Sequence, residues 1–316
     1  MLTFGPIPSR RLGQSLGINN IPPKICTYSC SYCQQGFSQK MSVERREFYE
    51  PEKILAEVTA RAKNVLDAGK VIDYLAFVPD GEPTLDINLG REISLLKKLG
   101  IPIAVITNAS LLWRKDVRND LLQADWVSVK VDTVDENIWR KIDHPVRSLS
   151  LDTVLKGIVA FAKEYRGTLV TETMLVRGLN DEKAALLPTA QFLAQIRPQK
   201  SYILVPTRPP ADKNTYPPKE ESINMAFQIF QGCLNSVECL IGYEGNNFAA
   251  TGNPADDILG ITAVHPMRED AVKDLLQRSQ ASWSIVSELL AKGDLVEVEH
   301  DGFRYYMRKL YDGYHR

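Results

Sequence analysis

Three cysteines lie within eight residues near the start of the chain: Cys26, Cys30 and Cys33. The spacing C-x3-C-x2-C places three thiolates on one short loop, and thiolates are the ligands that iron–sulfur clusters require. Four cysteines would close a [4Fe–4S] cluster, so three leave one iron open to a substrate or cofactor. Zinc sites favour paired CxxC units or added histidines. Neither occurs nearby, so the pattern indicates an iron–sulfur site.

This motif, with Tyr32 directly before its last cysteine, resembles the cluster-binding motif of the radical S-adenosylmethionine (radical SAM) superfamily. The resemblance implies that the open iron binds the amino and carboxylate groups of S-adenosylmethionine (SAM). It also implies that the reduced cluster cleaves SAM to methionine and a 5′-deoxyadenosyl radical, with an electron donor such as flavodoxin or ferredoxin. Tyr32 would then border the adenine, and simple packing is the alternative role.

A second loop, Asp80-Gly81-Glu82-Pro83, follows a predicted strand and resembles the Gly-Gly-Glu-Pro motif of the superfamily. The resemblance implies that Gly81 and Glu82 hold the methionyl ammonium of SAM. Asp80 stands where the superfamily has its first glycine, so the turn geometry of this loop is open. A plain turn rich in proline, glycine and aspartate is the alternative interpretation.

Polar side chains also mark the next two predicted strands. Asn108 follows the first of them, where the superfamily places a polar contact to the methionyl group of SAM. Ser128, Lys130 and Asp132 alternate along the second strand, so they point the same way. Lys130 can pair with the SAM carboxylate, and Asp132 can accept hydrogen bonds from ribose hydroxyls. Polar residues inside a buried barrel need partners, which favours binding over a solvated face.

The apolar pattern predicts alternating strands and helices along most of the chain. Continuous apolar strands between amphipathic helices indicate parallel βα units that are buried on both faces. Counting a strand ahead of the cysteines, about six units result, fewer than a closed eightfold barrel requires. We therefore expect an α/β fold with an open, partial (β/α)6 TIM-like barrel, whose chemistry lies at the C-terminal ends of the strands. The predicted strands are 73–78, 101–106, 126–131, 168–175 and 202–205, and the predicted helices are 51–69, 89–99, 115–123, 135–141, 151–165 and 182–195.

Three further segments give a narrower resemblance, to radical SAM proteins related to the wyosine-tRNA synthases. They are Phe4–Gly17, Asp135–Pro145 and Val176–Asp181, and the likeness spans roughly residues 4–206. True wyosine synthases have additional cysteines ahead of the SAM motif for a second cluster, whereas this chain has no cysteine before Cys26. Wyosine-type tRNA base modification is therefore an alternative function rather than the primary one.

A small second domain is predicted over residues 254–316, after a barrel domain over residues 1–253. Turn-rich residues 242–254 predict a linker, followed by three helices and a hairpin with Asp301-Gly302 as its turn. This order resembles a winged-helix α+β domain. Residues 262–316 hold eight Lys or Arg against nine Asp or Glu, a net charge of −1. Because phosphate neutralisation dominates nucleic-acid affinity, we expect protein or peptide substrates to dock here, with RNA as the alternative.

The whole composition favours a soluble cytoplasmic enzyme. Net charge is −1, and five cysteines, an odd number, argue against a disulfide framework. We expect no signal peptide and no membrane span, and a reducing compartment suits a [4Fe–4S] cluster. The primary hypothesis is a radical SAM enzyme that abstracts hydrogen from an unidentified peptide, protein or RNA substrate. An iron–sulfur-sensing transcription regulator is a further alternative, although a regulator would not need SAM-binding residues.

Five other residues have open roles. Arg10 and Arg11 could bind an anionic substrate group or the SAM carboxylate, or could be solvated, and Arg208 poses the same choice. Cys233 and Cys239 cannot complete a second cubane by themselves, so packing is the expected role. The sequence does not identify a catalytic residue beyond the cluster ligands.

Overall fold

The computed structural model describes residues 2–38, 40–241, 253–262, 266–300 and 302–309. The expected linker residues 242–252 and the hairpin turn residue Asp301 lie outside these described ranges. In the part of the chain that is described, no helix combines the length and the apolar character needed to cross a membrane.

An eight-stranded curved sheet forms the centre of the molecule, with strand order β1-β2-β5-β6-β7-β8-β9-β10. All neighbours from β2 to β10 pair in parallel, and only β1 runs antiparallel, to β2. The order begins at β1 and ends at β10 without a pairing between them, so the barrel is open, as the sequence predicts. The strands are Thr3–Ser9, Gly13–Ile18, Tyr74–Phe77, Ile103–Thr107, Trp126–Lys130, Thr168–Met174, Lys200–Leu204 and Val237–Leu240.

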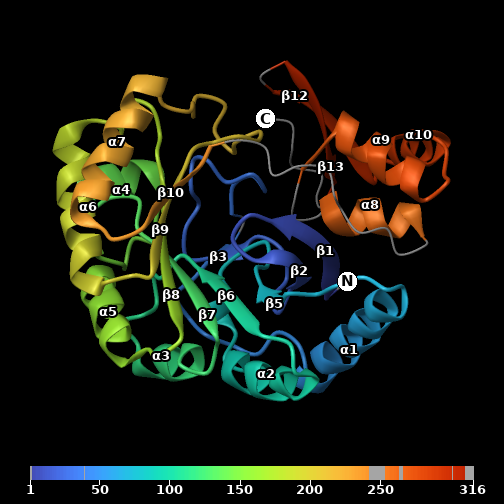
Figure 1. Ribbon diagram of the computed structural model, residues 1–316, viewed down its shortest axis with the longest axis horizontal. Coiled ribbons are helices and arrows are strands. Elements are labelled where there is room, and N and C mark those ends of the chain that lie inside the picture. Colours follow the sequence, from blue (N-terminus) through green and yellow to red (C-terminus); the bar gives the residue numbers. More distant parts are fainter. Residues whose placement is uncertain (1, 39, 242–252, 263–265, 301, 310–316) are drawn as a thin grey trace.

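Seven helices cover the outer, convex face of this sheet (Figure 1). Helix α1 shows why they form there: Pro51 occupies its first turn, and Ile54, Val58 and Val65 bury one face against the sheet. Two short 3-10 turns, 83–85 and 97–99, and a small two-stranded sheet of β3 (Ile25–Cys26) and β4 (Lys40–Met41) complete this part. The helices are α1 Pro51–Asp67, α2 Leu89–Leu96, α3 Lys115–Leu121, α4 Glu136–Ile142, α5 Leu151–Glu164, α6 Lys183–Ile196 and α7 Glu220–Cys233.

The two faces of the sheet carry different apolar sets, because successive side chains of a strand point to opposite sides. Alternate residues such as Leu75 and Phe77 pack against the helices. The residues between them form a separate cluster on the concave face. Small Ala76 and Ala104 leave room there for the large rings of Trp126 and Tyr202, so a packed floor fills one end of the barrel.

The C-terminal unit contains the predicted three helices and hairpin, and in addition one short strand. Its elements are α8 Pro254–Thr262, β11 Met267–Arg268, α9 Glu269–Arg278, α10 Ser284–Ala291, β12 Leu295–His300 and β13 Phe303–Arg308. The three strands form an antiparallel sheet in the order β11-β13-β12. The winged-helix assignment of this unit remains a prediction.

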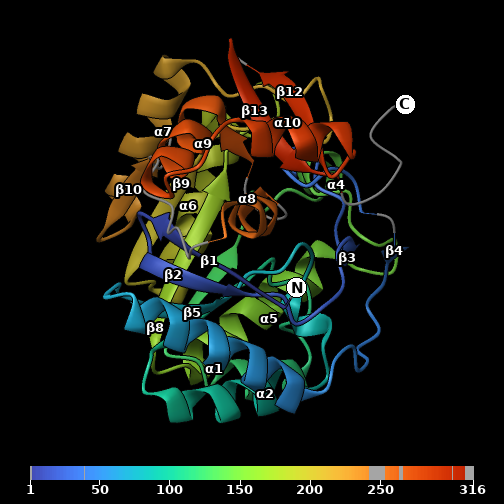
Figure 2. The same ribbon diagram turned by 90° about the vertical axis from the view of Figure 1, so that its right-hand side faces the viewer.

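This unit packs on the first strand of the barrel sheet. Phe4 and Ile7 of β1 belong to the same buried cluster as Ile258 of α8. The buried carboxylate of Asp257 also pairs with Arg61 of α1, with 3.1 Å between Oδ1 and Nη2. Both ribbon views place α8 next to β1 (Figure 1 and Figure 2).

Candidate active site

The three predicted cluster ligands face one cavity on the concave side of the sheet. Cys26, Cys30 and Cys33 all line this space of about 310 Å³, together with residues from the β1–β2 hairpin and from strand ends. Its size is in the range of ordinary small-molecule sites. All three cysteines are free. Burial raises the pKa of each thiol, that of Cys26 to about 12, so iron must displace the protons on binding.

Three free thiols on one cavity wall fit the donor set of a [4Fe–4S] cluster with one open iron. Within the described ranges, no three His, Cys, Asp or Glu side chains are gathered so that they could hold a single metal ion. The cysteines of a cubane are not gathered in that way either, because each of them binds a different iron.

The end of helix α4 clamps the cysteine loop from one side. The amide of Ser29 donates to the carbonyl oxygen of Asp143 at 3.0 Å, and the amide of Ser31 donates to that of Ile142 at 2.8 Å. The side chain of Asp143 also lies 3.2 Å from the sulfur of Cys30. Sequence reasoning did not single out Asp143, although its segment contributed to the narrower resemblance.

The Asp80–Pro83 loop clamps the cysteine loop from the other side. Gly81 forms a bridge with Ile25, and the amide of Glu82 donates to the carbonyl oxygen of Ile25 at 3.1 Å. A Cβ atom at position 81 would lie 2.1 Å from that oxygen, so only glycine allows this approach. Asp80, which stands in place of the first glycine of the motif, forms a buried ion pair with Lys24 at 3.5 Å. Burial raises the pKa of Asp80 to about 6, although Lys24 acts in the opposite direction.

Glu82 is buried behind the cavity wall, and its side chain connects its own loop to the end of β6. Its Oε1 accepts hydrogen bonds from the hydroxyl groups of Thr84 and Thr107, both at 2.6 Å, and its Oε2 accepts one from the amide of Asn108 at 2.8 Å. Burial raises its pKa, and these donors oppose that shift. The Asn108 side chain continues the connection, since its Nδ2 donates to Thr27 at 2.7 Å and lies 3.5 Å from the sulfur of Cys26.

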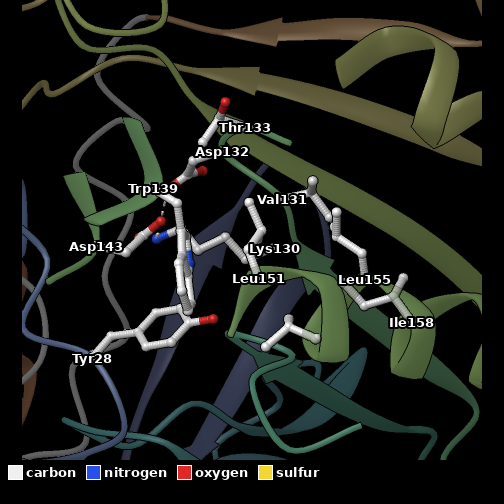
Figure 3. A pocket seen from close by; sticks show the side chains of 11 residues that line it. Tyr28, Lys130, Val131, Asp132, Thr133, Trp139, Asp143, Leu151, Leu155 and Ile158 are labelled. Carbon is white, nitrogen blue, oxygen red and sulfur yellow. Dashed lines mark ion pairs between the residues drawn. The ribbon is translucent and has the colours of Figure 1, made fainter. Parts of the chain in front are cut away.

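Tyr32, Lys130 and Asp132 form a contiguous group beside the cysteine loop. The Tyr32 hydroxyl donates to Asp132 Oδ2 at 2.5 Å, and the Lys130 ammonium lies 4.0 Å from the centre of the Tyr32 ring. Figure 3 shows the Lys130 ammonium beside the carboxyl groups of Asp132 and Asp143. Lys130, Asp132 and Asp143 line a second cavity of about 10 Å³, roughly the space of one water. Burial alone lowers the pKa of Lys130, but Asp132 and its other acidic neighbours raise it above the usual range.

Glu172 is a site residue that sequence reasoning missed. It lies on β8, lines the main cavity and accepts a hydrogen bond from Ser128 at 2.7 Å. Arg11 reaches the same oxygen, Oε1, at 2.5 Å. A charged residue in the otherwise strand-like segment Thr168–Met174 was the signal that could have revealed it.

The structure thus places two of the predicted cofactor-binding residues, Tyr32 and Gly81, on the wall of the main cavity. The other five do not line this cavity within the described residues and instead contact residues around it. They are Glu82, Asn108, Ser128, Lys130 and Asp132.

Comparison with known proteins agrees with this geometry. The family model of the Radical SAM superfamily matches residues 20–187, which is more than half of the chain, so the chain belongs to that superfamily. It is therefore an enzyme that uses a [4Fe–4S] cluster and SAM.

Some known proteins are similar to this chain in sequence, and others are similar only in fold. The chain is 48% identical to "UPF0026 protein MJ1312" of Methanocaldococcus jannaschii, over 98% of this chain and 96% of that protein. The structure of a radical SAM methyltransferase from Sphaerobacter thermophilus matches with 16% identity and a TM-score of 0.51, covering 72% of this chain and 66% of that one. Archaeal TYW1 matches at 16% identity and a TM-score of 0.48, over 70% of this chain and 72% of that chain, and this likeness bears on neither substrate nor mechanism.

Proposed function

We propose that this enzyme removes a hydrogen atom from a substrate that enters the barrel cavity. The three cysteines would hold the cluster, and the bound cluster and SAM would supply radical chemistry: on one-electron reduction, SAM would give methionine and a 5′-deoxyadenosyl radical able to take the hydrogen. The observation that carries this proposal is that Cys26, Cys30 and Cys33 share one cavity with charged side chains from distant segments, Arg11 and Glu172 among them. An electron donor such as flavodoxin or ferredoxin would provide the electron.

The residues of the chain hold and enclose the reacting groups. The three cysteines would bind three irons, and the hydrogen bonds of Glu82 and Asn108 fix the cysteine loop against the strand ends. Trp126 and Tyr202 close the opposite end of the barrel with packed rings. A closed floor keeps bulk water away from that side of the reaction.

The predicted cofactor contacts divide into two groups in this proposal. Tyr32 and Gly81 line the cavity, so they can touch SAM directly, Tyr32 at the adenine. The remaining residues hold these contacts in place from behind the cavity wall: Glu82, Asn108, Ser128, Lys130 and Asp132. Mutation of the second group should therefore affect SAM indirectly, by releasing a loop or the Tyr32 ring.

The C-terminal unit supports docking of a larger substrate beside the cavity. The hydroxyl of Tyr305 on β13 donates to the carbonyl oxygen of Thr207 at 3.1 Å, and Thr207 lines the cavity. The helix and strand order of this unit supports a winged-helix-like domain, and its net charge favours a protein or peptide over RNA. Wyosine-type tRNA modification and an iron–sulfur-sensing regulator remain the alternatives. The need for a reducing compartment supports a cytoplasmic location.

Anaerobic reconstitution tests the proposal. The protein should take up about four irons and four sulfides, and with dithionite it should convert SAM to 5′-deoxyadenosine and methionine. Replacing Cys26, Cys30 and Cys33 with alanine should abolish the visible absorption and this conversion. The matched control, in which Cys233 and Cys239 are replaced with alanine, should keep the visible absorption and the conversion of SAM, because neither residue lines the cavity. A complete [4Fe–4S] cluster in the triple variant would show that Cys26, Cys30 and Cys33 are not the cluster ligands.

A further inference from the structure

The inward-facing residues of the sheet form layers across the barrel. The packed floor is one layer, and the next lies two residues further along the same strands. Because a strand rises about 3.3 Å per residue, the two layers are roughly 6.6 Å apart. The floor consists of Ala76, Ala104, Trp126, Val170 and Tyr202. The second layer consists of Val78, Ile106, Ser128, Glu172 and Leu204. Among these five residues, Glu172 is the one carboxylate, and its neighbour Ser128 is the other polar residue.

The carboxylate of Glu172 is anchored through one oxygen only. Its Oε1 accepts hydrogen bonds from Ser128 at 2.7 Å and from Arg11 at 2.5 Å. Among the described residues, none donates a hydrogen bond to Oε2. The Glu172 side chain is 11% exposed to solvent, and it lines the main cavity. One oxygen is therefore fixed by the protein, and the other remains available to a molecule in the cavity.

The surroundings keep this carboxylate charged. Burial alone would raise the pKa of Glu172, but Arg11, Ser128 and Lys130 together lower it below its ordinary value. An ionised acceptor that is already oriented by two donors needs little rearrangement when a ligand arrives. Such a group accepts charge-assisted hydrogen bonds from N–H or O–H donors.

We propose that Glu172 binds the substrate, with Oε2 accepting a hydrogen bond from an ammonium or hydroxyl group of that molecule. This inference rests on the proposed function. The cysteine loop, which would hold the iron-bound end of the cofactor, follows the C-terminal end of β2, whereas Glu172 lies deeper, one layer above the floor. Glu172 would therefore face a molecule that enters between a cofactor held at the cysteine loop and the floor. The substrate is accordingly an amine or alcohol at the group held there.

Deuterium transfer from small surrogate substrates tests this role without knowledge of the natural one. Reconstituted protein receives SAM, dithionite and one of three carbon-deuterated probes: ethanolamine, ethylene glycol or propionate. In the measured step, a C–D bond of the probe breaks, a C5′–D bond forms in 5′-deoxyadenosine, and the unpaired electron stays on the probe carbon. Mass spectrometry gives the deuterated fraction of the 5′-deoxyadenosine formed.

The wild-type protein should take deuterium from ethanolamine or ethylene glycol with saturation, and about tenfold or more efficiently than from propionate, given the strength of a hydrogen bond to a charged group. Glu172→Gln should lose this preference. The control Glu238→Gln should keep it, because Glu238 pairs with Lys200 and does not line the cavity. Ser128→Ala keeps the charge but removes one anchor of Oε1, so it should lower the preference partly.

Ser128→Ala also decides the question if Glu172→Gln fails to fold. Equal transfer from all three probes, no transfer from any of them, or an unchanged preference in both variants would overturn the role of Glu172. Absence of any 5′-deoxyadenosine from the wild-type protein is a different result. It would overturn the proposed function itself, and this inference with it.

Discussion

Replacing Gly81 with alanine should abolish cluster binding while the barrel stays folded. The added methyl would lie 2.1 Å from the carbonyl oxygen of Ile25, whereas real Cβ contacts essentially never fall below 3.0 Å. The two segments must therefore separate by at least 0.9 Å. Ile25 directly precedes Cys26, so the displacement reaches an iron ligand, and metal–ligand distances tolerate only about 0.2 Å.

The energetic cost of this change is small relative to the whole fold. Overpacking of this kind costs about 1–3 kcal/mol, against a total stability of about 5–15 kcal/mol. Circular dichroism should therefore stay native, while iron and sulfide content after anaerobic reconstitution falls to background. Gly178→Ala is the matched control, since Gly178 has a φ of +71° with no atom within 4 Å of its added Cβ. Gly81→Ala protein with full iron content would refute the argument from the clash.

Two remaining predictions concern pH and nucleic acid. Burial raises the pKa of Asp86 to about 7 and that of Glu92 to about 9, and the negative charge of Asp86 adds to the second shift. Both carboxyl groups have a higher pKa in the folded protein than in the unfolded chain. Their contribution to the free energy of unfolding is therefore fully present below about pH 4 and is lost as pH rises through the pKa values of the folded protein. Glu92→Gln should thus raise the melting temperature of the cluster-free protein at about pH 9 but not at about pH 5. A wild-type melting temperature that is constant over this pH range would contradict the raised pKa values. In mobility-shift titrations with tRNA, the whole protein should bind weakly, with a shallow dependence on salt, whereas submicromolar binding with a steep salt slope would favour the RNA alternatives.

The elements of the barrel were predictable because the information that specifies them is local. The strand expected at residues 73–78 is Tyr74–Phe77, and the helix expected at 151–165 is Leu151–Glu164. Apolar periodicity within a window of several residues is sufficient for such assignments. The three cysteines are equally local, since one short loop contains all of them and brings them to one cavity.

The partners inside the barrel were not predictable in this way. The alternation of side chains along a strand indicated that Ser128, Lys130 and Asp132 lie on one face of the sheet. It did not indicate which residues or which cavity they contact. Lys130 and Asp132 lie against Tyr32, about 100 positions earlier in the chain, and line the smaller cavity. Glu172 receives its charge partner from a residue 161 positions away. Such pairs depend on the curvature of the sheet, which brings distant strands together and which no short window of sequence specifies.

The packing of Phe4 and Ile7 into the C-terminal unit has a consequence for the order of folding during synthesis. These residues of β1 share a buried cluster with Ile258, which the ribosome adds 254 positions after Phe4. At about 5–20 residues per second, translation leaves β1 without these apolar neighbours for roughly 13–50 seconds. The barrel can pair its parallel strands in that interval, before the apolar neighbours of β1 in α8 have been synthesised. Packing of α8 on β1 is therefore a late event in folding, because it must await the synthesis of Ile258.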